Sequence, residues 1–296
     1  MAHIVGGLAT SHVPSIGTAI AKHETETPYW KPFFDAFKPV HTWLDQTKPD
    51  IAVVLYNDHG LNFFLNTMPT FALGAAATYA NADEGWGIPV LPSFTGEPRL
   101  SWHLANALVD KEFDIATCQE MLVDHAFTLP MKLMFPNAGD RWPVKVVPVS
   151  INSIQHPLPS PHRCWKLGNV IGEAVRSWKS DAKVVVVATG GLSHQLDGTR
   201  AGFINADFDR FCLDAIVDHP GSLVRLSTAE IIEKAGSQGV ELMTWIAMRG
   251  ALPNEVSHIS STYHVPVSNT GGAVLLLDTA SQPSAAPERV EHRVEA

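Results

Sequence analysis

Short runs of apolar, mostly β-branched residues recur along the chain and predict buried strands. Two of them, Ile51–Tyr56 and Val184–Thr189, are apolar along most of their length. Continuous runs of this kind are typical of strands that are covered on both faces, as in a parallel sheet. Three further runs fit the same description: His3–Ala9, Val144–Val149 and Ala273–Leu277.

Helical patterns lie between these runs, for example at Leu100–Val109, Arg163–Trp178 and Ala206–Val217. Strands that alternate with helices predict an α/β fold in which a mostly parallel sheet is sandwiched by helices. The stretch Asn62–Gly96 is rich in glycine, proline and aromatic residues, so we expect a long loop excursion over the active-site end of the sheet.

The C-terminal third carries helix boundary signals. Residues 227–230, Ser-Thr-Ala-Glu, form a capping-box pattern, and Gly236 is placed to end that helix. Ser237 is expected to cap a second helix from about Gln238 to Arg249. Residues 279–296 are polar and contain proline, which predicts a disordered tail after a single domain over residues 1–278.

Composition narrows the class of protein. Apolar residues make up 45% and charged residues 17% of the chain, which is ordinary for a globular protein. The first residues lack the pattern of a signal peptide, and no uninterrupted apolar run is long enough to span a membrane. We therefore expect a cytoplasmic protein with no membrane contact. The net charge is −9 without a basic cluster, which argues against nucleic acid as a partner.

Three histidines directly follow predicted strands: His12, His59 and His194. Ligands of open α/β sheets bind beyond the carboxyl ends of the strands, so these imidazoles are expected to converge there. For any one of them, a hydrogen-bonded loop histidine is the commoner role. Three in the same topological position favour a common site.

Glu241 lies on a predicted helix that is apolar almost all round and should be buried. A buried carboxylate is costly unless it is paired or bound to a cation. A salt bridge, for instance to Arg249, and a metal site are both compatible with this position. Two imidazoles and one carboxylate with open positions are typical of non-haem Fe(II) oxygenases, although zinc hydrolases use similar ligands.

Many segments of the chain resemble one family of enzymes. They are TSHVPSIG, VLYNDHGLNFFLNTMPTFALG, ADEGWG, VDHAFTLPM, TGGLSHQLDG, RAGFIN, GSQGVELMTWIAMRGAL and YHVPVSNTGGA. Over residues 1 to about 278 the chain is similar to the large, catalytic subunit of protocatechuate 4,5-dioxygenases, which are extradiol ring-cleavage dioxygenases. The resemblance implies one Fe(II) held by His12, His59 and Glu241, with His194 as the catalytic acid and base.

The same resemblance suggests roles for further residues. His125 matches a second active-site histidine, and Ser268 and Asn269 match a pair that meets the substrate carboxylate. Asn57 would orient a ligand or the substrate. A core histidine, turn residues and a strand-end turn are the structural alternatives for these positions.

The expected reaction inserts both atoms of O2 into a catechol acid and yields an open-chain carboxymuconate semialdehyde. Protocatechuate is the first candidate substrate, and gallate or another substituted catechol is the alternative. Two alternative functions of other classes are a zinc hydrolase and a non-catalytic member of the superfamily. The resemblance also implies a separate small helical alpha subunit that covers the site, in an α2β2 assembly. Residues 279–296 are too few and too polar to build such a unit.

Overall fold

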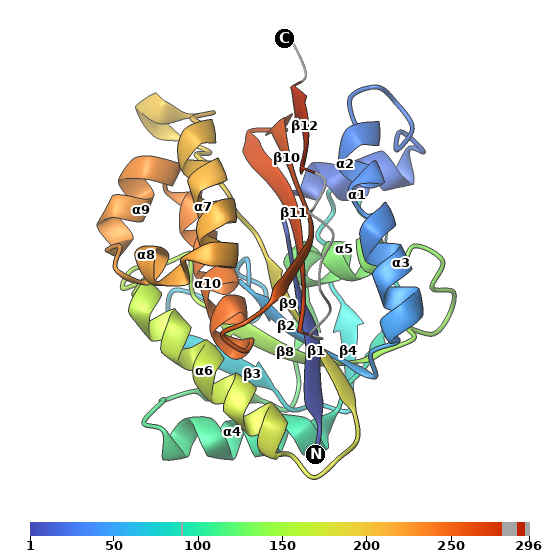
Figure 1. Cartoon of the computed structure of the whole chain (residues 1–296), viewed down its shortest axis with the longest axis vertical. Coiled ribbons are helices and arrows are strands. Elements are labelled where there is room, and N and C mark those ends of the chain that lie inside the picture. The colour runs from blue at the N-terminus through green and yellow to red at the C-terminus, as the bar shows by residue number, and fades with distance from the viewer. Residues whose placement is uncertain (90, 280–288, 294–296) are drawn as a thin grey trace.

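The computed structural model describes residues 1–89, 91–279 and 289–293. Its main feature is a nine-stranded sheet, seen edge-on in Figure 1. In spatial order the strands are β12 (Arg289–Arg293), β10 (Ser257–Val267), β11 (Thr270–Asp278), β1 (His3–Thr10), β9 (Lys183–Thr189), β2 (Ile51–Tyr56), β8 (Lys145–Ile151), β3 (Phe71–Gly74) and β6 (Ala116–Cys118). The four central strands β1, β9, β2 and β8 are all parallel, whereas β11 is antiparallel to both of its neighbours.

Helices cover both faces of the sheet, and each face has its own apolar core (Figure 1). One face carries α4 (Pro98–Asp110), α6 (Pro161–Ser177), α7 (Ala206–Asp218), α8 (Pro220–Val224), α9 (Thr228–Ala235) and α10 (Leu242–Ala251). The other face carries α1 (Pro14–Ala21), α2 (Lys31–Asp35), α3 (Lys38–Thr47) and α5 (His125–Met134). The α/β fold expected from the alternating pattern is therefore confirmed. None of the helices in the described ranges combines the length and apolar character that crossing a membrane requires.

Close packing of two helices fixes the position of α10. A Cβ at Gly168 or Gly172 of α6 would collide with the backbone carbonyls of Ala247 and Ala251. Glycine at these two positions lets the helix backbones approach each other directly. Because α10 also packs on β9, the residue that precedes it, Glu241, is held against the central strands.

The predicted strands agree with the structure to within a few residues, but two regions differ. The stretch Asn62–Gly96 is not a continuous loop, since it contains β3, β4 (Thr78–Asn81) and β5 (Phe94–Thr95). β4 and β5 form a second small sheet with β7 (Leu122–Val123). β10 was not expected, because its sequence SHISSTYHVPV lacks the apolar run that marks the central strands. A strand next to the end of the sheet that is only partly buried does not need such a run.

The C-terminal boundaries are partly as expected. Ser227 and Glu230 form the predicted capping box, and Gly236 ends α9. Ser237, however, does not cap the next helix through its side chain. The chain makes a 3₁₀ turn over Gln238–Glu241 before α10 begins.

The tail expected to be disordered differs from the structure at residues 289–293. These residues form β12, which pairs with β10 in parallel. The edge of β10 offers unpaired backbone groups, which a following segment can satisfy. Residues 280–288 and 294–296 of the same prediction lie outside the described residues.

Candidate metal centre

Three neighbouring parallel strands deliver histidines to one edge of the sheet. His12 follows β1, His59 follows β2, and His194 follows β9, which lies between those two strands. All three line a single cavity of about 290 Å³, together with His125 and Glu241. A cavity of this size lies at the small end of ligand pockets and suits a molecule of one ring. The convergence expected from the strand ends is thus present.

Glu241 lies between the two histidines expected to share a metal with it. Its Oε1 is 3.5 Å from His12 Nε2 and 3.8 Å from His59 Nε2. Two ligand atoms at right angles, each about 2.1 Å from one metal ion, are separated by about 3 Å. Two imidazole nitrogens and one carboxylate oxygen at this spacing fit a divalent cation such as Fe(II).

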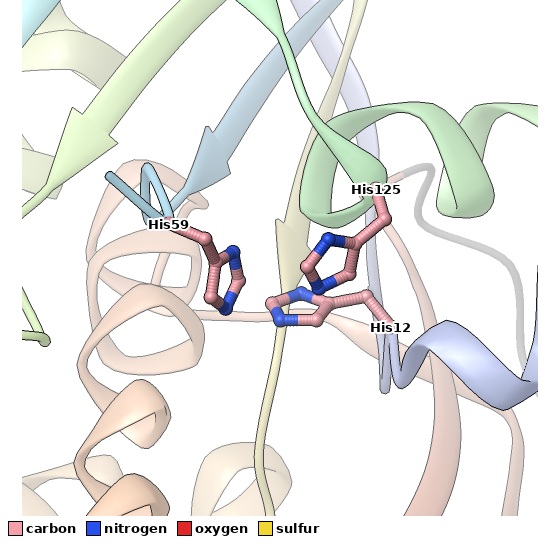
Figure 2. A group of neighbouring side chains, drawn as sticks. All are labelled: His12, His59 and His125. Carbon is pink, nitrogen blue, oxygen red and sulfur yellow. The ribbon is translucent and has the colours of Figure 1, made fainter. Parts of the chain in front are cut away.

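A second combination of ligand atoms is also available. Ring nitrogens of His12, His59 and His125 lie within 4.8 Å of one another, and the three rings face a common space (Figure 2). The rings of His59 and His125 are tilted by 31° to each other, with centroids 4.3 Å apart. A three-histidine set therefore competes with the His12, His59 and Glu241 set on geometry alone.

In two of these histidines, His12 and His59, an oxygen atom of another side chain lies within hydrogen-bond distance of Nδ1. Asp124 Oδ2 lies 3.1 Å from His59 Nδ1 and accepts the backbone N–H of His59 at 2.8 Å. The hydroxyl of Thr189, at the end of β9, lies 3.0 Å from His12 Nδ1. A contact of this kind on Nδ1 leaves Nε2 free to bind a metal.

The charges at the centre also suit a cation. Burial lowers the pKa of His12. Burial alone would lower the pKa of His59, but the carboxylates of Asp124 and Glu241 outweigh it and raise the pKa to about 10. Burial alone would raise the pKa of Glu241, yet His12 and His59 together hold it well below its usual range. The two carboxylates thus favour a proton on His59, which places a positive charge between them. A metal ion would replace that proton as the positive charge.

Glu241 finds its partners inside the site and not in a salt bridge to Arg249. Its Oε2 accepts the backbone N–H of Gly191 at 2.7 Å, and its Oε1 lies 3.2 Å from Asn57 Nδ2. Arg249 instead donates to the backbone carbonyls of Ile216, Pro253 and Asn254. Asn57 Nδ2 is also 3.1 Å from His59 Nε2, so Asn57 contacts two candidate ligands directly.

His125 is held by a loop that the sequence did not connect with it. Glu84 Oε1 lies 2.8 Å from His125 Nδ1, and Glu84 Oε2 accepts the backbone N–H of His125 at 2.7 Å. The ring of Trp86 lies 5.2 Å from that of His125 and lines the cavity. The structure therefore brings part of the expected excursion, residues 83–87, to the site.

Glu84 and Asp124 are the acidic residues that sequence reasoning missed. Asp124 precedes His125 and accepts the backbone N–H of Ala126 as the N-cap of α5. That capping position, next to a histidine already singled out, was a usable signal for it. Glu84 is separated from His125 by 41 positions, and nothing local in the sequence links the two.

His194 differs from the other histidines in its contacts. Its backbone N–H donates to the carbonyl of Ala235 at 2.7 Å, but its Nδ1 has no hydrogen-bond partner within the described part of the chain. Burial lowers the pKa of His194. A neutral imidazole that lines the cavity is suited to accept a proton.

Of the two residues expected to bind the substrate carboxylate, Ser268 and Asn269, only Ser268 lines the cavity. Ser268 lines it, adopts the left-handed conformation with φ 56°, and donates its backbone N–H to the hydroxyl of Tyr29 at 3.0 Å. Asn269, exposed in the same turn between β10 and β11, does not belong to the cavity wall as described. Two larger hollows, of about 670 and 700 Å³, lie elsewhere and share no lining residue with this site.

Comparisons with known proteins identify relatives of this chain. The chain is 39% identical over 212 residues to gallate dioxygenase from Pseudomonas putida, covering 72% of this chain and 62% of that protein. It is 32% identical over 187 residues to 2,3-dihydroxyphenylpropionate/2,3-dihydroxicinnamic acid 1,2-dioxygenase from Photorhabdus laumondii, covering 63% of this chain and 55% of that protein. The chain thus matches less than two thirds of the length of each of these relatives.

The fold also matches a solved structure, and a family model matches most of the chain. An uncharacterized protein from Escherichia coli K12 aligns with a TM-score of 0.54 at 13% identity, over 92% of this chain and 99% of that chain. At this identity the likeness shows the fold alone. The family described as the catalytic LigB subunit of aromatic ring-opening dioxygenase matches residues 6–274, which include every candidate ligand. This chain therefore belongs to the LigB family of aromatic ring-opening dioxygenase subunits.

Proposed function

We propose that this chain is the catalytic unit of a non-haem Fe(II) extradiol dioxygenase that opens the ring of a catechol acid. The observation that carries the proposal is the approach of His12 Nε2 and His59 Nε2 to within 3.5 and 3.8 Å of Glu241 Oε1 at one cavity. Family membership supports it, because aromatic ring opening is the chemistry that the family description states.

The residues fit Fe(II) by their donor chemistry. Two neutral imidazoles and one carboxylate on one side of a metal leave its other positions open. Bound there, Fe(II) would supply a Lewis acid that lowers the pKa of a catechol hydroxyl. Asp124 would orient His59 through its Nδ1, and Asn57 contacts both His59 and Glu241.

The cavity side chains are assigned the following work. His194, neutral because burial lowers its pKa, takes a proton from a substrate hydroxyl and later returns it. His125, fixed by Glu84, lines the same cavity and meets the second hydroxyl. Ser268 lines the cavity and donates a hydrogen bond to the substrate carboxylate. Asn269, in the exposed turn beside it, is assigned a second hydrogen bond to that carboxylate from outside the cavity wall.

The substrate is a catechol acid, and gallate and protocatechuate are the two to test first. Protocatechuate follows from the sequence resemblance, whereas the relative from Pseudomonas putida acts on gallate by its name. The two acids differ by one ring hydroxyl. A single hydroxyl is distinguished by only a few pocket contacts, so a direct comparison of rates decides between the two acids.

Oxygen uptake tests this function. The purified chain, reconstituted anaerobically with Fe(II), is given gallate, protocatechuate and 2,3-dihydroxyphenylpropionate, and oxygen consumption and ring-opened product are followed. We expect one equivalent of O2 per molecule of an acid that is turned over, and none with Zn(II) in place of Fe(II). Absence of uptake with every acid, in a protein that holds iron stoichiometrically, would contradict the proposal.

We further propose that a separate small helical subunit covers the cavity, in an assembly with two copies of each chain. Trp86 and Leu196 line the cavity, yet 53% and 58% of their surface is exposed. Apolar side chains at the rim of a site are commonly buried by a partner. A cover would also exclude water from the reacting groups.

Co-expression tests the cover. We expect weak turnover by this chain alone and an increase when a helical partner from the same source is co-purified. A Leu196→Glu change should abolish that increase, measured as the turnover of the variant with the partner relative to the turnover of the same variant alone. Full activity of the isolated chain, unchanged by any co-purified protein, would show that it needs no cover.

A further inference from the structure

Asp209 on α7 is a buried acid outside the cavity wall. It has no exposed surface, and its carboxylate accepts hydrogen bonds from two different segments of the chain. Its Oδ1 accepts the backbone N–H of Ser193 at 2.9 Å and the Ser193 hydroxyl at 2.6 Å. Its Oδ2 accepts the hydroxyl of Tyr263 on β10 at 2.6 Å.

These bonds connect the segment that carries His194 with the hairpin of β10 and β11. Ser193 immediately precedes His194, and its carbonyl accepts the backbone N–H of Gly271 on β11 at 2.9 Å. Leu192 donates in turn to the carbonyl of Gly271, and His194 forms a β-bridge with Thr270. Asp209 therefore braces the two backbone segments that line the cavity from this side.

The need for such a brace follows from the contacts of the histidine rings. The Nδ1 atoms of the other three cavity histidines have oxygen partners, which are Thr189 for His12, Asp124 for His59 and Glu84 for His125. The Nδ1 of His194 has none within the described residues. The orientation of the His194 ring must therefore come from its backbone, which Asp209 holds one residue away.

Packing alone does not explain an acid at this position. A carboxylate loses its hydration on burial, and an apolar side chain of similar volume would fill the same space at lower cost. An apolar side chain would, however, leave the N–H and hydroxyl of Ser193 and the hydroxyl of Tyr263 without their acceptor. The carboxylate therefore contributes fixed positions for its partners, because it accepts hydrogen bonds from three donors at once.

We propose that Asp209 is a positioning residue for the proposed reaction, which sets the place of His194 through Ser193 and Tyr263. It touches neither substrate nor metal ligand and acts only through the backbone of residues 192–194. The inference rests on the proposed role of His194. It predicts that loss of the carboxylate impairs proton transfer while metal and substrate binding stay intact.

Asp209→Asn tests this, because the amide nitrogen that replaces one carboxylate oxygen is a donor and cannot accept the hydroxyl of Tyr263 while the amide oxygen accepts from Ser193. We expect kcat to fall about 10- to 100-fold, since small displacements of a reacting group have effects of this size. Iron content and KM should stay within about twofold of the unsubstituted protein. Asp207→Asn, on the same helix with a wholly exposed side chain, is the matched control and should leave kcat unchanged.

A double substitution separates positioning from general damage. In a His194→Ala background, Asp209→Asn should cause no further loss of kcat, because the residue it positions is gone. An equal additional loss in that background, or unchanged kcat in Asp209→Asn alone, would overturn the proposal. If Asp209→Asn does not fold, Tyr263→Phe removes one of the three donors and should lower kcat in the same His194-dependent way.

A readout without turnover keeps this inference distinct from the proposed function. The imidazole NMR signals of His194, assigned by their loss in His194→Ala, should shift in Asp209→Asn and not in Asp207→Asn. Unchanged signals would refute the positioning role even if the protein is an active dioxygenase. Shifted signals in a protein without oxygen uptake would support the brace while refuting the proposed reaction.

Discussion

Asp124 holds His59 at two points, with its Oδ2 accepting the backbone N–H at 2.8 Å and lying 3.1 Å from the ring Nδ1. The same carboxylate caps α5, the helix that begins at His125. One buried acid thus fixes a candidate ligand and the helix that carries the neighbouring histidine. The centre depends on groups that never touch the metal.

Asp124→Asn should weaken iron binding about 10- to 100-fold, because the amide removes the charge that orients and polarises His59. Asparagine caps helices as well as aspartate, so thermal stability should change little. Titration of the metal-free protein with Fe(II) under anaerobic conditions measures the affinity. An unchanged dissociation constant would show that His59 needs no such partner.

His59→Ala and His194→Ala should differ in phenotype although both histidines line one cavity. His59→Ala removes a proposed ligand and should lose iron. His194→Ala should retain stoichiometric iron and bind substrate, yet lose about 10²- to 10⁴-fold in kcat, as expected for an acid and base. Metal analysis alongside oxygen uptake checks both. Equal iron loss in the two variants would make His194 a ligand.

Glu241→Ala and His125→Ala distinguish the two possible ligand sets. We expect Glu241→Ala to lose iron, because its Oε1 lies between the nitrogens of His12 and His59. His125→Ala should keep the iron and lose turnover, since its Nδ1 is engaged with Glu84 and its ring is assigned to substrate. Retention of iron by Glu241→Ala with its loss from His125→Ala would establish the three-histidine set.

Ser268→Ala should raise KM for a catechol acid more than for catechol itself. A hydrogen bond to a charged acceptor contributes about 1.5–3 kcal/mol, which corresponds to a change of about 10- to 100-fold in affinity. Ser268 is exposed in a turn, so the fold should tolerate the substitution. Equal effects on both substrates would remove its role in carboxylate recognition.

Asp209 should make the fold more stable as the pH falls. Burial raises the pKa of Asp209 to about 6, above its ordinary 3.8, so the folded protein binds the proton more tightly than the unfolded chain. The cost of the buried charge is present above pH 6 and disappears as the pH falls toward 4. Relative to Asp209→Asn, the wild type should gain about 1 kcal/mol between about pH 7.5 and about pH 5. Urea unfolding of both proteins measures this, and a gain on raising the pH would contradict it.

The sequence by itself determined the central parallel strands and the convergence of three histidines at one edge of the sheet. Continuous apolar runs such as Ile51–Tyr56 require cover on both faces, which places them in the middle of a parallel sheet. Parallel strands end at one edge, so His12, His59 and His194 had to converge. The capping box at Ser227 was equally local, because its partners lie within one helical turn.

Only the tertiary structure decided which groups hold these histidines. Glu84 reaches His125 across 41 positions, and Asp209 reaches Tyr263 across 54, through loop and strand paths that no local pattern encodes. β10 was not predicted because a strand that is only partly buried can carry many polar residues. Periodicity and capping depend on neighbours in sequence, whereas hydrogen bonds between buried side chains depend on where the backbone returns. The candidate ligands could therefore be predicted from the sequence, whereas the contacts of Glu84 and Asp209 become apparent only in the folded chain.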